Sequence, residues 1–323
     1  MAKPEHGSLT LVCPICHGML ESTTPKGLSC MSCGCDFPAY SETVPVLVRQ
    51  QDIPLVHSWL GGAPGHVDAF DKYVEVRKNS PLTVMYYDWW SGRMIDMIPA
   101  GNVGPVAELM CGRAELTRRM PARFSVAAAT DLNLMVCQAA KRDLEAMGKG
   151  GVKVFCASAG CLPIEDESVG AVAIQGALHH ARPILNDVFR EICRVLKPGG
   201  VFVGSEPAND SLSIRLLRRV QYRLSSLQGN DLDEDGFTRD ELSRSLVASG
   251  LRMESYLQFG TVAYVLMGNT DLVPILARSQ NMALGRALLR VDAYLERLPL
   301  IRNLGMANLF TARKEKIDVK QTG

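Results

Sequence analysis

The 323-residue sequence has 35 Lys and Arg against 34 Asp and Glu, so its net charge of +1 gives no general attraction to nucleic acid or anionic membranes. No apolar run approaches the roughly 18 residues that cross a bilayer. The first residues also lack the apolar core of a signal peptide, so we expect a cytoplasmic protein without a membrane span. Because the length exceeds the roughly 250 residues at which a single core stops growing, we expect one full-sized domain with a small module attached.

The cysteines are concentrated near the amino terminus, where Cys13 and Cys16 form one CxxC pair and Cys30 and Cys33 form a second. Two thiolates two residues apart can bind one ion, and two such pairs complete a tetrahedral zinc shell. Four thiolates leave no open position, so we expect a structural zinc ion within residues 1–48. Reduced cysteines without metal are the alternative, and a disulfide framework does not suit a cytoplasmic protein.

Residues 49–70 are predicted to be a linker, because Pro54 and the Gly61-Gly62 and Pro64-Gly65 pairs interrupt any periodic pattern. The aromatic run from Tyr86 to Trp90 follows in a segment that we expect to be helical. Its side chains either line a pocket or pack the helix against a sheet.

Two buried strands with acidic residues at or near their ends are predicted next. The first, Val106 to Leu109, contains Glu108 and leads into a turn with one glycine, Gly112. The second ends in Asp131, and a third strand is predicted within residues 152–159. Glycine favours a turn that lets the backbone approach a ligand closely.

A helix and a further strand come later in the chain. Apolar residues recur at helical spacing from Ile184 to Leu196, with polar residues on the other face. Pro198 and the glycine pair after it are expected to end the helix, and residues 201–203 to begin a strand. Such alternation of strands and helices predicts an α/β fold.

These motifs together resemble the class I S-adenosylmethionine-dependent methyltransferases, in particular the ubiquinone- and menaquinone-biosynthesis type. The resemblance lies in the Leu178-His179-His180 turn, in the run from Arg190 to Gly200 and in the acidic residues of the first two strands. It implies a Rossmann-like seven-stranded sheet with helices on both faces over residues 71–314. The cysteine-rich head resembles the zinc ribbons of several bacterial methyltransferases and the small zinc-ribbon partner protein of tRNA methyltransferases.

The resemblance also implies S-adenosylmethionine as cofactor. Asp131 would accept the ribose hydroxyls, and Ser158 stands where the family has an aspartate that binds the adenine amino group. Met110 and Ala114 stand where the family has glycines, which either narrows the space for the methionine moiety or shifts the backbone. The expected cofactor contacts are Tyr87, Glu108, Met110, Gly112, Asp131, Leu132, Ser158, Ala159 and Gln175.

His179 and His180 follow the fourth strand, at the edge where ligands bind in this architecture. Either histidine could deprotonate a methyl acceptor, although the pair can also be purely structural. Helical insertions are expected around residues 207–235 and 268–300, where they would form a lid or a homodimer surface, and residues 315–323 are expected to be a tail. Thr238 and Glu241 have the spacing of a capping box, which predicts a helix before a strand at residues 251–259, and a last strand is expected near residues 308–314.

Three functions follow from these features. The leading one is methyl transfer to an O, N or C nucleophile of a small molecule, in which the protein mainly aligns donor and acceptor. The second is methylation of an RNA base, since a zinc-ribbon head also precedes the methyltransferase domain in bacterial rRNA guanine methyltransferases, but the near-zero net charge argues against it. The third is a non-catalytic or repurposed S-adenosylmethionine-binding protein, for which the support is Met110, Ala114, Ser158 and Gly170.

Overall fold

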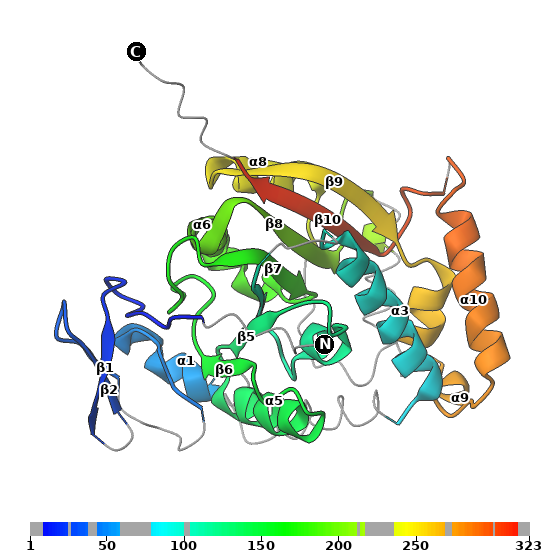
Figure 1. The fold of residues 1–323 in the computed structure, drawn as a ribbon. Coiled ribbons are helices and arrows are strands. Elements are labelled where there is room, and N and C mark those ends of the chain that lie inside the picture. Colours follow the sequence, from blue (N-terminus) through cyan, green and yellow to red (C-terminus); the bar gives the residue numbers. More distant parts are fainter. Residues whose placement is uncertain are drawn as a thin grey trace, which may run out of the picture.

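The structure is a computed structural model, and its strands build one small sheet and one large sheet (Figure 1). It describes residues 9–24, 27–37, 44–58, 79–99, 104–211, 214–216, 236–268, 273–299 and 301–315. Within the described part of the chain, no helix is both long and apolar enough to span a membrane.

The small sheet lies near the amino terminus and has three antiparallel strands. These are β1 (Leu20–Thr24), β2 (Gly27–Cys30) and β3 (Asp36–Phe37). A separate small core, made of Cys13, Cys30, Phe37 and Leu47, lies beneath it. We call residues 9–48, so far as they are described, the N-terminal module.

The large sheet has seven strands in the order β6-β5-β4-β7-β8-β10-β9. Neighbours among β4 to β8 pair in parallel, and β10 is antiparallel to both of its neighbours. The strands are β4 (Val106–Leu109), β5 (Val126–Asp131), β6 (Lys153–Cys156), β7 (Val169–Gln175), β8 (Leu196–Pro207), β9 (Leu251–Phe259) and β10 (Ala307–Lys314). This is the seven-stranded α/β fold expected from the sequence.

Helices cover both faces of the large sheet (Figure 1). Helices α3, α4, α5 and α10 pack on one core, whereas α6 and α8 pack on the other. Successive strand residues point to opposite faces, so Val201 and Val203 enter the first core and Phe202 enters the second. The helices are η1 (Gln50–Asp52), α1 (Ile53–Ser58), α3 (Pro81–Met97), α4 (Glu115–Arg119), α5 (Leu134–Ala146), η2 (Leu178–Ile184), α6 (Leu185–Val195), α8 (Arg239–Ala248), η3 (Tyr264–Gly268), α9 (Pro274–Ala277) and α10 (Met282–Leu295).

Two segments differ in secondary structure from what the sequence indicated. Residues 50–58, within the predicted linker, form η1 and α1, because Pro54 lies in the first turn of α1, where a missing N–H costs no hydrogen bond. Strand β8 begins at Leu196, ahead of the predicted start at residue 201. The register shift between Val169 and Ala171 of β7 places Pro198 in an irregular stretch of β8, where no ladder hydrogen bond requires its N–H.

The remaining predicted elements lie where the sequence indicated. Thr238 caps α8 by accepting a hydrogen bond from the Glu241 N–H at 3.2 Å, and β9 has the predicted bounds. The predicted linker residues 59–70 lie outside the described part of the chain, as do residues 217–235 of the first insertion. The second predicted insertion, around residues 268–300, carries α9 and α10.

Candidate functional site

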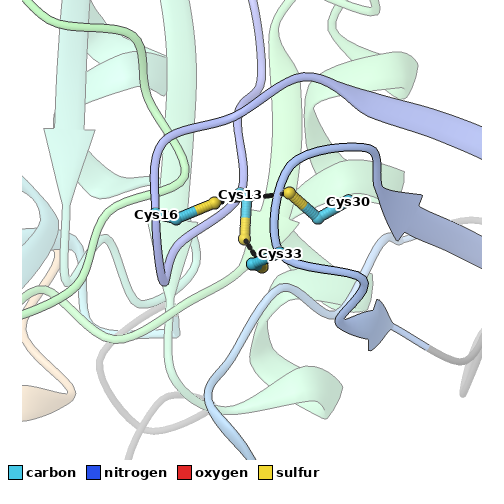
Figure 2. Close-up of side chains that lie close together, drawn as sticks. All are labelled: Cys13, Cys16, Cys30 and Cys33. Carbon is cyan, nitrogen blue, oxygen red and sulfur yellow. Dashed lines mark hydrogen bonds between the residues drawn. The ribbon is translucent and has the colours of Figure 1, made fainter.

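The four predicted zinc ligands lie together in the N-terminal module. Their sulfur atoms are all within 4.8 Å of one another, and Figure 2 shows them pointing toward a common centre. The Sγ atoms of Cys13 and Cys33 are 3.7 Å apart, and those of Cys16 and Cys30 are 3.4 Å apart. A tetrahedral zinc ion with Zn–S bonds of about 2.3 Å would place its sulfurs about 3.8 Å apart, so the four residues fit this metal.

Backbone N–H groups favour thiolates in this cluster. The Ile15 N–H donates to Cys13 Sγ and the Ser32 N–H to Cys30 Sγ, both at 3.4 Å. The Cys33 backbone N–H is the main cause that lowers the pKa of Cys30 to about 6, whereas burial raises the pKa of Cys13 to about 12 when no metal is bound. Such donors orient and stabilise metal-binding thiolates, so the cluster has the surroundings as well as the geometry of a metal centre.

A second group of predicted residues lies at the carboxyl edge of the large sheet, in the turn between β4 and α4. Met110, Gly112 and Ala114 have φ values of 50°, 52° and 58°, which glycine adopts readily and other residues do not. This left-handed conformation costs about 1–2 kcal/mol at each of the two non-glycine positions. The two substituted positions therefore keep a backbone conformation that suits glycine.

The side chains of this turn leave its centre open. Met110 packs against the core on the α6 side of the sheet, and the Ala114 methyl is buried in the opposite core. A Cβ atom added at Gly112 would meet no atom within 4 Å. Neither substitution therefore fills the space at Gly112.

Asp131 lies beside this turn, at the end of β5. Its Oδ2 accepts the Gly112 N–H at 3.0 Å, and its Oδ1 accepts the Asn133 N–H at 3.0 Å. Burial raises the pKa of the Asp131 carboxyl. Each carboxylate oxygen can accept a second hydrogen bond, so Asp131 can still bind a hydroxyl.

Glu108 has a structural role that the sequence did not indicate. Its Oε1 accepts the Leu116 N–H at 3.0 Å and its Oε2 accepts the Thr117 N–H at 2.7 Å, so the carboxylate anchors the start of α4. Burial raises the pKa of Glu108 to about 7. Any contact of Glu108 with a cofactor stays a prediction.

Ser158 follows β6 at the same edge, since β5 and β6 pair in parallel with Asp131 opposite Cys156. The Ser158 side chain is buried, and its Oγ accepts the Gly160 N–H at 3.3 Å. The neighbouring Ala159 is also buried. Leu132, another predicted cofactor contact, accepts a hydrogen bond from the Cys156 thiol through its backbone carbonyl, at 3.0 Å.

Gln175 ends β7, close to the aromatic helix α3. Its Oε1 accepts the Ser91 hydroxyl at 3.0 Å, and its buried Nε2 has no hydrogen-bond partner among the described residues. A buried donor without a partner in a native fold commonly faces a ligand or a water molecule. Gln175 is therefore a candidate ligand contact.

The aromatic residues of α3 mainly pack the helix. Tyr86 and Trp90 are buried in the core, and Trp90 Nε1 donates to Ser205 Oγ at 2.8 Å. Tyr87 is half-buried, with its ring centroid 5.5 Å from that of Trp90. Of the two interpretations left open by the sequence, packing holds for Tyr86 and Trp90, and Tyr87 stays a candidate site residue.

The predicted histidines differ in their surroundings. His179 Nδ1 lies 2.7 Å from Oε2 of the buried Glu206, whereas His180 is exposed. Glu206 also accepts the N–H groups of Ala177 and Leu178 at 2.7 Å each. Sequence reasoning missed Glu206, although an acidic residue at the end of a buried strand is the same signal that pointed to Asp131.

Comparison with known proteins identifies the central part of this sheet. Residues 107–204 match the family model described as a methyltransferase domain. The matched segment runs from β4 to β8 and contains the Gly112 turn, Asp131 and the histidine pair. This chain carries a methyltransferase domain. Among curated proteins, no sequence matches the chain.

Solved structures resemble this chain at low sequence identity. A protein of Bacillus halodurans C-125, provisionally named a methyltransferase, is 14% identical with a TM-score of 0.50, and the match covers 70% of this chain and 99% of that one. A provisionally named sarcosine dimethylglycine methyltransferase of Galdieria sulphuraria is 18% identical over 72% of this chain and 86% of that one, with a TM-score of 0.49. Geranyl diphosphate C-methyltransferase of Streptomyces coelicolor A3(2) is 14% identical over 70% and 79%, with a TM-score of 0.46.

At these identities the likeness establishes the fold alone, which is a Rossmann-like methyltransferase fold. Within the methyltransferase domain, the family match includes Ser158 and Gln175. Tyr87, Glu206 and the four clustered cysteines lie outside the matched segment.

Proposed function

We propose that this protein is an S-adenosylmethionine-dependent methyltransferase that acts on an O, N or C nucleophile of a small molecule. The observation that carries the proposal is the turn around Gly112. Met110, Gly112 and Ala114 all have the left-handed backbone conformation that suits glycine, and a Cβ added at Gly112 would meet no atom within 4 Å. Asp131 lies within hydrogen-bond distance of this turn. These features support a site that still binds the cofactor, rather than one that has lost binding.

The residues at this edge suit the parts of the cofactor. Asp131 would accept the ribose hydroxyls with the lone pairs that remain on its carboxylate. The Ser158 hydroxyl would accept one hydrogen bond from the adenine amino group, and the Gly112 turn would admit the methionine chain. The Gln175 Nε2 donor is buried without a partner among the described residues and is available to a ligand acceptor.

When bound, S-adenosylmethionine supplies a methyl group activated by its positively charged sulfur. The protein would align the acceptor with this group and exclude water. Glu206 would hold the His179 ring through Nδ1 and so act as its positioning residue. His180 and His179 are our candidates for removing a proton from an O–H or N–H acceptor.

Calorimetric titration with S-adenosylhomocysteine tests the cofactor site. Hydrogen bonds to a charged group contribute about 1.5–3 kcal/mol, so Asp131→Ala should weaken binding by about tenfold or more. Glu254→Ala is the matched control, because Glu254 pairs with Arg313 on β10, near the opposite edge of the sheet, and should not change affinity. Absence of binding to the wild type would remove the proposal, and unchanged affinity of Asp131→Ala would place the cofactor elsewhere.

We further infer that the four clustered cysteines hold one structural zinc ion. Two observations support this inference. The four sulfur atoms lie within 4.8 Å of one another, and the backbone N–H groups of Ile15 and Ser32 donate to two of them. Elemental analysis of protein prepared without chelator should give one zinc per chain, and Cys30→Ser should lower this content. Preparations without zinc would contradict the inference.

The remaining proposals concern the surroundings of the enzyme. We propose a cytoplasmic location, a small-molecule methyl acceptor as the partner, and a homodimer formed through the C-terminal helices. Ile275 of α9 and Val291 and Tyr294 of α10 are exposed apolar or aromatic side chains that such a dimer would cover. Light scattering after size-exclusion chromatography measures the assembly directly, and a monomer mass would contradict the dimer.

A further inference from the structure

The N-terminal module is joined to the edge of the large sheet by a short added strand. The Leu47 N–H donates to the Cys156 carbonyl and the Cys156 N–H donates to the Pro45 carbonyl, both at 2.8 Å. Val46 forms a parallel bridge with Cys156 of β6, the edge strand. Figure 1 shows the module at this end of the sheet, beside β6 and α1. We call residues 44–48 the seam strand.

The seam strand contributes side chains to two cores. Val44, Val46 and Val48 enter the main core beneath the large sheet, and Leu47 enters the small core of the N-terminal module. This alternation has the period of a β-strand, with Pro45 exposed and the other four residues buried. The module is therefore packed against the methyltransferase domain and not merely tethered to it.

The residue that pairs with the seam strand also contacts the candidate cofactor site. The Cys156 thiol donates to the Leu132 carbonyl at 3.0 Å, and the Ala157 N–H donates to the Asp131 carbonyl at 2.9 Å. Asp131 and Leu132 are the residues expected to contact the ribose. Cys156 therefore connects the seam strand directly to Leu132, one of the residues expected to contact the ribose.

A second connection comes from the first cysteine pair. Pro14 lies between Cys13 and Cys16, and its carbonyl accepts a hydrogen bond from the buried thiol of Cys161. Immediately before this pair, the Val12 N–H donates to the Pro163 carbonyl at 3.1 Å. Leu11 also forms an antiparallel bridge with the residue after Pro163. The module therefore contacts residues 161–164 at several points.

These contacts hold the loop that carries Ser158. The Cys161 N–H donates to the Ser158 carbonyl at 3.0 Å, so the thiol that contacts Pro14 is three residues from the predicted adenine contact. On the other side, Glu191 of α6 accepts the Leu162 N–H at 2.6 Å, and Arg194 donates to the Leu162 carbonyl at 2.9 Å. The loop thus lies between the module and α6.

We propose that the N-terminal module is a positioning element of the cofactor site, and that metal in its cysteine cluster strengthens cofactor binding by fixing the loop of residues 157–164. The proposal rests on the proposed function of that site. A metal ion held by Cys13 and Cys16 fixes the backbone between them, and hence the Pro14 carbonyl that holds Cys161. Without the metal, the Pro14 carbonyl is held less firmly, and this support of the Ser158 loop is weakened.

A positioning role predicts a reciprocal effect that a purely structural role does not. If metal raises cofactor affinity by some factor, the cofactor must raise metal affinity by the same factor. We expect a factor of about ten, within the usual range for coupled sites. S-adenosylhomocysteine affinity is measured by calorimetry with zinc-loaded and zinc-free protein. Zinc affinity is measured by competition with a chromophoric chelator, with and without S-adenosylhomocysteine.

A variant that keeps its zinc separates the contact from the metal itself. Cys161→Ala removes the thiol that contacts Pro14 and should weaken S-adenosylhomocysteine binding several-fold at unchanged zinc content. Cys193→Ala is the matched control, since the Cys193 thiol also contacts a backbone carbonyl, that of Gly250, but lies away from the module. Circular dichroism checks that both variants are folded.

The outcomes distinguish the inference from the function on which it rests. Equal affinities of the two zinc-loaded variants, or zinc affinity that does not change with S-adenosylhomocysteine, would overturn the inference and leave the proposed function standing. Failure of the zinc-loaded wild type to bind S-adenosylhomocysteine would instead remove the proposed function. Tighter binding in the zinc-loaded form together with a matching rise in zinc affinity would support the inference.

Discussion

In the turn between β4 and α4, individual residues hold a backbone conformation that their side chains oppose. The sequence identified Met110 and Ala114 as departures from a glycine pattern, but it could not show whether the backbone had shifted in response. Their φ values of 50° and 58° show that it keeps the left-handed conformation. Backbone dihedrals depend on surrounding contacts, here the burial of Ala114 and the packing of Met110, and a single sequence does not contain that information.

Gly112 allows the cost of this conformation to be measured directly. A Cβ added there meets no atom within 4 Å, so Gly112→Ala should lower the free energy of unfolding by about 1–2 kcal/mol from the backbone conformation alone. Gly92 in α3 is the matched control, because an added Cβ is equally unhindered and the helical backbone favours alanine by about 0.5–1 kcal/mol. Urea unfolding of the two variants should thus give effects of opposite sign. A stabilising Gly112→Ala would contradict the described turn.

At the scale of elements, the strands and helices that the sequence predicted best are those with a strong local pattern. β5 is a short apolar run ended by Asp131, and α6 alternates apolar and polar faces, so both lie where they were expected. The start of β8 was missed because a Pro-Gly-Gly run normally marks the end of a helix and is not expected inside a strand. In the structure this run lies within β8, where the pairing with β7 is irregular. The role of Glu108 was missed because it depends on a contact with α4.

Glu108 makes the stability of the folded protein dependent on pH. Burial raises its pKa from 4.5 to about 7, so the folded protein binds this proton more tightly than the unfolded chain does. The stabilising contribution of the proton is therefore complete below about pH 4.5 and is lost as the pH rises through about 7. The corresponding fall in the free energy of unfolding is on the order of 3 kcal/mol.

Glu108→Gln removes this titration. We expect the unfolding free energy of the variant to change less between pH 5 and pH 8 than that of the wild type, so the variant gains relative stability at the higher pH. Urea titrations at several pH values measure the difference. Glu145→Gln is the control, because Glu145 is exposed on α5 and should leave the pH profile of the wild type unchanged. Parallel profiles for Glu108→Gln and the wild type would contradict this role.

At the scale of the whole molecule, the sequence predicted both parts of the chain but not their arrangement. The two CxxC pairs located the N-terminal module, and the strand motifs located the methyltransferase domain. Their connection depends on contacts distant in sequence, such as Leu47 with Cys156 and Val12 with Pro163. Residues 44–48 were assigned to the module as a whole, although Val44, Val46 and Val48 belong to the core of the larger domain.

This arrangement predicts that the seam strand protects the sheet from association. β6 is the edge strand, and without residues 44–48 its Cys156 N–H and carbonyl would be exposed, as edges that pair with other chains are. A variant that begins at residue 49 should therefore form larger species than the full chain in light scattering at equal concentration. A variant that begins at Val44 lacks the cysteine cluster but retains the seam strand, and it should associate much less. If the two truncations gave the same mass distribution, association would come from loss of the module as a whole and not from the uncovered edge of β6.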